Sequence, residues 1–207
     1  GSILGPLLFL VYINDICKSS DLLRFILYAD DTNIFYSCES VDQLCDVVNR
    51  ELQGVVQWFK ANRLSVNLKK TNFVIFGSPA KTKSVKKCEI LLDNVNINRT
   101  NEAKFLGVII DEHLSWKSHI TYIKGKIAKN IGIMNRLKFL LSEKTLLSLY
   151  STLVLPYLNY CNIIWASNKP SRINPLLLLP KRLVRIITNS THIAHSEPLF
   201  FKLNQLT

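Results

Sequence analysis

The stretch Tyr28-Ala29-Asp30-Asp31 contains the start of an acidic turn in this 207-residue chain, because two short apolar runs, Leu22 to Ala29 and Asn33 to Tyr36, flank Asp30-Asp31-Thr32. Short aliphatic and aromatic runs on either side of an acidic turn predict a β-hairpin. Adjacent carboxylates at a hairpin tip repel each other unless they are solvated or bound to cations. Asp30 and Asp31 are therefore candidate metal ligands, although Asp-Asp pairs are also common in ordinary surface turns.

The segments around this hairpin alternate between helical and extended patterns. Gly5-Pro6 predicts a helix that opens with proline at its first position. Ser40 and Gln43 fit a capping box for a helix that ends near Asn62. Further along, we expect strands over Leu64 to Leu68, Phe73 to Phe76, Glu89 to Leu92 and Lys104 to Ile110, a turn over Lys69 to Asn72, and an exposed loop over residues 78–88.

Beyond Ser115 the apolar residues recur with a helical period. Trp116, Ile120, Ile123, Ile127, Ile131 and Met134 form one stripe, which predicts a helix of about 20 residues. More helix is expected over Ser142 to Leu155, near Tyr157 to Trp165, and over Pro175 to Thr188, with a kink or restart at Pro180. The fold class is α+β: a mixed unit followed by a helical one, with the change near Asp111.

The net charge of +11 lies entirely in the second half of the chain. Residues 1–112 hold 13 Lys/Arg and 13 Asp/Glu, whereas residues 113–207 hold 13 Lys/Arg and only Glu143 and Glu197. This asymmetry favours a polyanion such as nucleic acid over a merely solvated surface. The candidate contacts to a nucleic-acid backbone are Lys117, Lys124, Lys126, Lys129, Arg136, Lys181, Arg182 and Arg185.

The cysteines, histidines and apolar runs point to no additional site. The five cysteines are odd in number and widely spaced, which favours reduced thiols in an intracellular protein. No membrane segment is expected, because the apolar runs are shorter than the about 20 residues that a spanning helix needs. The histidines lack the set of neighbouring Cys or carboxylate ligands that would complete a tetrahedral zinc site.

Four blocks, in chain order, resemble those of reverse transcriptases from non-LTR (LINE-type, jockey- and CR1-like) retrotransposons. The blocks are Gly1 to Phe9 with Tyr12 to Asp15; Tyr28 to Asp31; Trp58, Asn62, Leu64, Asn67, Lys70 and Thr71; and Phe105 to Val108 with Asp111, Leu114, Trp116 and His119. Leu155, Tyr157, Tyr160, Cys161 and Trp165, followed by Lys181, Arg182 and Arg185 to Ile187, resemble the tail of the same elements.

The resemblance implies a fold and an activity. Residues 1–112 would be a partial polymerase palm, with a β-hairpin, a small antiparallel sheet and the primer grip. Residues 113–207 would be a basic, all-helical, thumb-like segment. The implied activity is RNA-directed DNA synthesis with two Mg²⁺ ions, and the implied partners are an RNA template, a DNA primer and deoxynucleoside triphosphates. Location in the nucleus would follow during retrotransposition, and the oligomeric state stays open.

The resemblance also implies roles for single residues. Asp30 would bind the catalytic metal ions and Asp31 would assist or orient. Gly1, Ser2 and Tyr28 would border the incoming nucleotide, the templating base and the primer end, and Lys70 would approach the triphosphate. Phe105, Leu106 and Gly107 would form the turn that holds the primer strand.

One departure from the family pattern bears on activity. The family's other metal-binding aspartate lies on a strand that would precede Gly1, and the fingers would precede it too. None of Asp15, Asp21 and Asp111 stands in that aspartate's place, so we expect a fragment that is inactive, or nearly so, on its own. Two alternatives stay open: a non-catalytic nucleic-acid-binding remnant of a decayed or domesticated element, and a polymerase that copies RNA into RNA.

Overall fold

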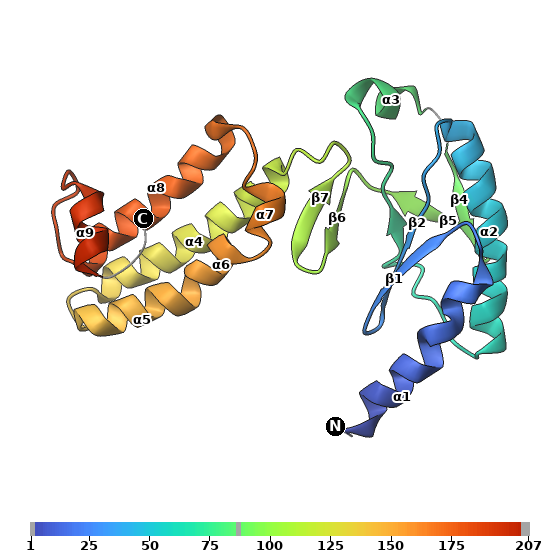
Figure 1. The fold of residues 1–207 in the computed structure, drawn as a ribbon, viewed down its shortest axis with the longest axis horizontal. Coiled ribbons are helices and arrows are strands. Elements are labelled where there is room, and N and C mark those ends of the chain that lie inside the picture. Colours follow the sequence, from blue (N-terminus) through green and yellow to red (C-terminus); the bar gives the residue numbers. More distant parts are fainter. Residues whose placement is uncertain (1–2, 86–87, 204–207) are drawn as a thin grey trace. The chain divides into compact units, whose positions relative to one another are not determined.

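The computed structural model describes residues 3–85 and 88–203 and divides into two compact units, Gly1–Ala103 and Lys104–Thr207 (Figure 1). The predicted nucleotide-binding residues Gly1 and Ser2 lie outside the described residues. The first unit is mixed α/β. It contains helices α1 (Leu4–Ile13), η1 (Asn14–Ser19, a 3-10 helix), α2 (Val41–Ala61) and α3 (Pro79–Ser84), and strands β1 (Arg24–Tyr28), β2 (Asp31–Phe35), β3 (Asn72–Phe73), β4 (Ile90–Leu92) and β5 (Val95–Arg99).

Two small sheets build the first unit. Strands β1 and β2 form the antiparallel hairpin expected around Asp30. The second sheet has the order β3-β5-β4. In it β4 runs antiparallel to β5, but β3 runs parallel to β5, so the prediction of an antiparallel sheet is wrong for this strand.

The long helix α2 organises the core of the first unit. It packs against β4 and η1, and its Val55 and the Ile16 of η1 are completely buried. The core also contains Ile13, Leu23, Cys45, Leu52, Ile90, Leu92 and Ile97. Ser40 is the N-cap of α2, as predicted, but its side chain makes no capping hydrogen bond.

Two predicted strands of this unit are wrong, one entirely and one in part. Residues 64–68 form no strand, although Val66 and Leu68 pack against the core, and the expected strand over residues 73–76 is reduced to β3. The expected loop over residues 78–88 contains the short helix α3, whose N-cap Ser78 accepts from the backbone of Lys81. Strand β5 was not predicted.

Cys45 and Cys88 form a disulfide, with their Cα atoms 5.8 Å apart. The prediction of reduced thiols is therefore wrong for these two residues. They lie 43 residues apart in the sequence, so spacing alone could not pair them. The other cysteines, Cys17, Cys38 and Cys161, are free.

The second unit begins with a β-hairpin and continues as helices. The hairpin joins β6 (Glu102–Phe105) to β7 (Val108–Asp111), where one strand was predicted over residues 104–110. The helices that follow are α4 (Lys117–Leu137), α5 (Glu143–Leu153), α6 (Leu155–Asn159), α7 (Asn162–Trp165), α8 (Pro170–Ile187) and α9 (Ser196–Lys202). The long helix predicted from the stripe at Trp116 to Met134 is confirmed as α4.

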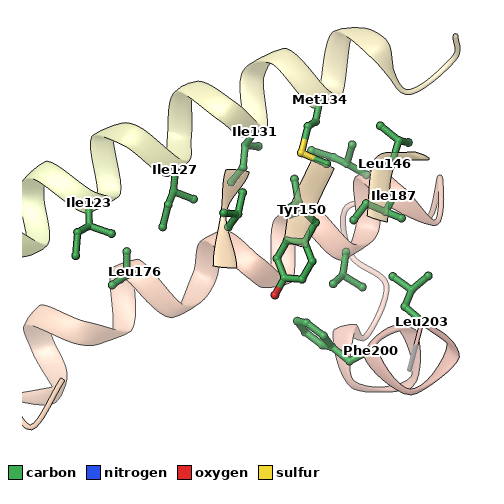
Figure 2. Packing of buried hydrophobic residues seen from close by; sticks show 14 of the residues in the cluster. Ile123, Ile127, Ile131, Met134, Leu146, Tyr150, Leu176, Ile187, Phe200 and Leu203 are labelled. Atoms are coloured by element: carbon green, nitrogen blue, oxygen red, sulfur yellow. The ribbon is translucent and has the colours of Figure 1, made fainter. Parts of the chain in front are cut away.

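That stripe forms the centre of the second core (Figure 2). Ile127 and Met134 are completely buried on α4, which packs along α8 and also contacts α5. Tyr150 of α5 and Phe200 of α9 belong to the same cluster. The core thus joins helices that are far apart in the sequence.

Helix α8 runs through Pro175 and Pro180 without a break, so the predicted restart at Pro180 is wrong. A proline inside a helix costs roughly 3 kcal/mol. The flanking residues Leu176, Leu183 and Val184 are almost completely buried. Their packing offsets the lost hydrogen bonds and keeps the segment helical.

In the part of the chain that the structure describes, no helix has both the length and the apolarity needed to cross a membrane.

Candidate functional site

The hairpin of β1 and β2 turns through two residues, Ala29 and Asp30, because Tyr28 pairs directly with Asp31. Ala29 has a φ of 50°. A positive φ at the first loop position is a feature of the primed turns that match the twist of antiparallel strands. It is uncommon for a residue other than glycine and is found where surrounding structure holds it. The acidic pair therefore sits on a tightly defined turn.

The two faces of this hairpin differ in environment. Phe25, paired with Ile34, and Leu27 pack against the core of the first unit. Because side chains alternate between faces, the Tyr28 and Asp31 pair lies on the opposite, exposed face. The side chain of Tyr28 is 60% exposed. The hairpin is thus anchored on one side and displays its tyrosine and aspartate on the other.

Asp30 and Asp31 are both exposed, and in the described structure neither carboxylate makes a hydrogen bond or an ion pair. Free carboxylate oxygens are the hard ligands that Mg²⁺ prefers. Within residues 3–85 and 88–203, no three Asp, Glu, His or Cys residues cluster closely enough to hold a metal ion. The pair fits part of a Mg²⁺ coordination shell, and the described residues add no third carboxylate.

The other carboxylates considered are engaged elsewhere. Asp15 accepts a hydrogen bond from the indole Nε1 of Trp58 at 3.2 Å. Asp111 accepts from the backbone N–H groups of His113, Ser115 and Trp116, and from the hydroxyl of Ser115. Burial raises the pKa of Asp111, but these hydrogen bonds outweigh it, so that the pKa lies below its ordinary value. Asp111 therefore organises the turn before α4.

The block from Trp58 to Thr71 makes mainly structural contacts. Tyr12 donates a hydrogen bond to the carbonyl of Asn62, whose side chain in turn donates to the carbonyl of Trp58 at 2.9 Å. These contacts tie α1 to the end of α2. Lys70 is exposed in the turn that follows, and its backbone N–H donates to Asn67. Within the described residues, its ammonium makes no hydrogen bond or ion pair with Asp30 or Asp31, so its role at the triphosphate stays a prediction.

The predicted primer-binding residues lie at the tip of the hairpin between β6 and β7. Leu106 and Gly107 form its two-residue loop, with φ values of 45° and 86°. Two positive φ values are the requirement of a type I′ turn. The hydroxyl of Tyr160, the C-cap residue of α6, donates to the carbonyl of Leu106 at 2.6 Å and holds the turn in place. Sequence reasoning gave Tyr160 no role, although its place in the tail block was a signal.

The basic residues of the second unit are largely exposed. Lys117, Lys124, Lys126, Lys129 and Arg136 project from α4, and Lys181 and Arg182 project from α8. Arg185 differs, because its guanidinium donates to the carbonyls of Ala194 and Lys181 at 2.7 and 3.3 Å. It holds the loop after α8 in place, and contact with a nucleic-acid backbone stays a prediction for all eight residues.

Comparison with known proteins places these features in a family. Residues 1–110 match the family model described as reverse transcriptase (RNA-dependent DNA polymerase). No solved structure matches the chain significantly.

Three relatives from fruit flies are named as RNA-directed DNA polymerases. The one from transposon BS of Drosophila melanogaster, a probable polymerase, is 29% identical over 99% of this chain and 23% of its own length. The one from the X-element of the same species, also a probable polymerase, is 27% identical over 91% and 21%. The jockey polymerase of Drosophila funebris is 24% identical over 92% and 21%. The chain spans about a fifth of the length of these curated relatives.

The matching region includes both the Asp30–Asp31 hairpin and the loop at Leu106 and Gly107. This chain belongs to the reverse transcriptase family, in its LINE-type branch represented by the polymerases of mobile elements such as jockey.

Proposed function

We propose that this chain is part of an RNA-directed DNA polymerase, in which Asp30 and Asp31 bind the catalytic Mg²⁺ ions. The observation that carries the proposal is the exposed pair of carboxylates, without side-chain partners, at the tip of the β1–β2 hairpin, inside the region that matches the family. When bound there, Mg²⁺ would supply the activation of a primer 3′-hydroxyl and the charge stabilisation of the leaving pyrophosphate.

The other residues would position the substrates. Tyr28, on the same face of the hairpin as Asp31, would border the primer end. The ammonium of Lys70 would neutralise the triphosphate as pyrophosphate leaves. Phe105, Leu106 and Gly107 would hold the primer strand, and the exposed lysines of α4 would bind phosphates of the RNA–DNA hybrid without reading its sequence. In this assignment the first unit is part of the palm, and the helices of the second unit are thumb-like.

The chain alone is proposed to be inactive, because its described residues offer two adjacent carboxylates and no third ligand. The exposure of α1 is in keeping with a larger parent protein. Its Leu8 and Val11 are 66% and 77% exposed, and a helix that is apolar on all sides is normally covered. Further segments of the parent polymerase would cover this helix and complete the metal site.

The test is primer extension on an RNA template with a DNA primer, Mg²⁺ and deoxynucleotides, beside an Asp30→Asn variant and with duplex binding measured in parallel. We expect no extension from either protein and salt-sensitive binding of the hybrid by both. Extension by the unmodified chain that is lost in Asp30→Asn would overturn the proposed inactivity. A failure to bind the hybrid even at low salt would refute the nucleic-acid role of the basic helices.

A further inference from the structure

A cavity of about 290 Å³ lies beside the loop of Leu106 and Gly107, entirely within the second unit. Three tyrosines line it, together with residues of the β6–β7 hairpin: one comes from α4, one from α6, and one is the C-cap residue of α6. Its walls include Lys104, Gly107, His119, Tyr122, Tyr157 and Tyr160. A volume at the low end of ligand pockets, which begin near about 300 Å³, suits one small unit and excludes a duplex.

His119 gives this cavity an unused hydrogen-bond donor. The residue is 2% exposed, and its Nδ1 accepts the backbone N–H of Ile109 at 3.3 Å. Burial lowers the pKa of His119, which favours the neutral ring, whose proton must then reside on Nε2. Among the described residues, Nε2 has no partner. A buried donor without a partner destabilises the folded chain. A ligand whose acceptor atom binds this N–H would remove that penalty.

The aromatic ring of Tyr122 is surrounded by positive charge. The ammonium groups of Lys104 and Lys126 lie 5.9 and 5.5 Å from its centroid. The Tyr122 ring is nearly parallel to the imidazole of His119, at an interplanar angle of 23°, and Trp165 packs edge-on against that imidazole. Among the described residues, no carboxylate lines the cavity. The walls therefore combine an aromatic face with one cation, Lys104, and the ammonium of Lys126 lies near the same aromatic ring. This combination suits an anion that has a flat apolar part.

We propose that this cavity binds one unpaired nucleotide of a single-stranded nucleic acid. Its base would lie against Tyr122, its phosphate would lie beside Lys104, and one of its oxygens would accept from Nε2 of His119. Only an unstacked base offers its face to an aromatic side chain, and such stacking tolerates every base. The inference rests on the proposed function for the source of the strand, a template or primer end.

The test is fluorescence anisotropy of the 207-residue chain with labelled oligonucleotides of about ten nucleotides, oligo-dT and oligo-rU in separate arms. Tyr122→Leu removes the aromatic face, while Tyr122→Phe retains it as a matched control. We expect roughly tenfold weaker binding for the leucine variant, and binding within about twofold for the phenylalanine variant. An oligomer of abasic sites should bind both variants equally.

Two further variants test the polar contacts. His119→Asn retains an acceptor for the N–H of Ile109 but lacks Nε2, and it should weaken binding about threefold to tenfold. Lys104→Gln should weaken binding more than Lys144→Gln, which removes an equal charge from an exposed site on α5. Circular dichroism and thermal unfolding establish that each variant is folded.

The outcomes separate this inference from the proposed function. Equal binding of single strands by Tyr122→Leu and Tyr122→Phe, with hybrid binding intact, would overturn the cavity as a nucleotide site and leave the polymerase assignment standing. Unchanged binding by His119→Asn would overturn the role of Nε2. If the unmodified chain binds neither single strands nor the hybrid, both proposals are refuted together.

Discussion

The carboxylate of Asp111, the last residue of β7, accepts the backbone N–H of Trp116, the N-cap of α4, at 2.8 Å. Trp116 has a φ of 60°, and Leu114 before it has a φ of 50°. Leu114 and Trp116 thus form a turn with left-handed backbone conformations, and the Asp111 carboxylate accepts hydrogen bonds from the N–H groups of that turn. This relationship positions α4, and with it His119 and Tyr122, after the hairpin.

Replacing Asp111 should therefore destabilise the second unit. We expect Asp111→Asn to lower the free energy of unfolding by about 1–2 kcal/mol, the cost of a lost capping group. Denaturant unfolding measures this change. Glu197→Gln is the control, because it removes the same charge from an exposed site and should cost no more than a few tenths of a kcal/mol. Equal effects of the two variants would refute the capping role.

The same carboxylate should make stability depend on pH. Its pKa in the folded chain lies below the ordinary value, so the unfolded state binds more protons between the two pKa values. The stabilisation is then fully present above about pH 3.9, the ordinary value, and is lost as the pH falls through the lowered pKa. The difference in Tm between the parent and Asp111→Asn should shrink across that range. A constant difference would contradict this account.

Gly54 should be required for the packing of α2. A Cβ at this position would lie 2.5 Å from the carbonyl oxygen of Ser19 in η1. Gly54→Ala should lower the free energy of unfolding by about 1–3 kcal/mol, as overpacking does, despite alanine's better helix propensity. Gly125→Ala is the matched control in α4, where a Cβ meets nothing within 4 Å. It should raise stability by about 1 kcal/mol. A change in the free energy of unfolding that has the same sign for both variants would contradict the close contact between Gly54 and Ser19.

The disulfide between Cys45 and Cys88 should stabilise the first unit. Closing a loop over a separation of 43 residues corresponds to about 4 kcal/mol in the chain-entropy model. We expect a reductant to lower the unfolding midpoint of the oxidised chain, and to leave Cys88→Ala unchanged. Peptide mapping without reductant should recover the two cysteines in one linked fragment, and Cys17→Ser should not alter it. Separate peptides from oxidised protein would contradict the pairing.

The sequence was informative where one local pattern determined the structure. The stripe from Ile120 to Met134 predicted α4, because a period near 3.6 buries one face of a helix whatever packs against it. The runs on either side of Asp30 predicted the hairpin, because a two-residue turn between strands is a local feature. The same holds for the candidate metal ligands, which are adjacent in the chain.

The errors occurred where distant residues decide the outcome. Leu64 to Leu68 alternates like a strand, yet no strand within residues 3–85 and 88–203 pairs with it, and its apolar side chains pack as an irregular segment. Helix α8 persists through Pro180 because Leu183 and Val184 are buried by other helices. The cavity at Tyr122 joins residues from 104 to 160, and no spacing in the sequence brings them together. Packing of this kind is not encoded in local periodicity.

The proposed binding of metal ions by Asp30 and Asp31 can be measured directly by cleavage of the chain itself. Fe²⁺ in place of Mg²⁺, with ascorbate and peroxide, cuts a polypeptide close to where the metal is bound. With an RNA–DNA hybrid and deoxynucleotide present, we predict cleavage around Tyr28 to Thr32 that excess Mg²⁺ suppresses. Combined replacement of Asp30 and Asp31 by asparagine should abolish it, whereas Asp21→Asn should not. Cleavage absent from this hairpin, or unchanged in the double variant, would contradict the assignment of the metal site.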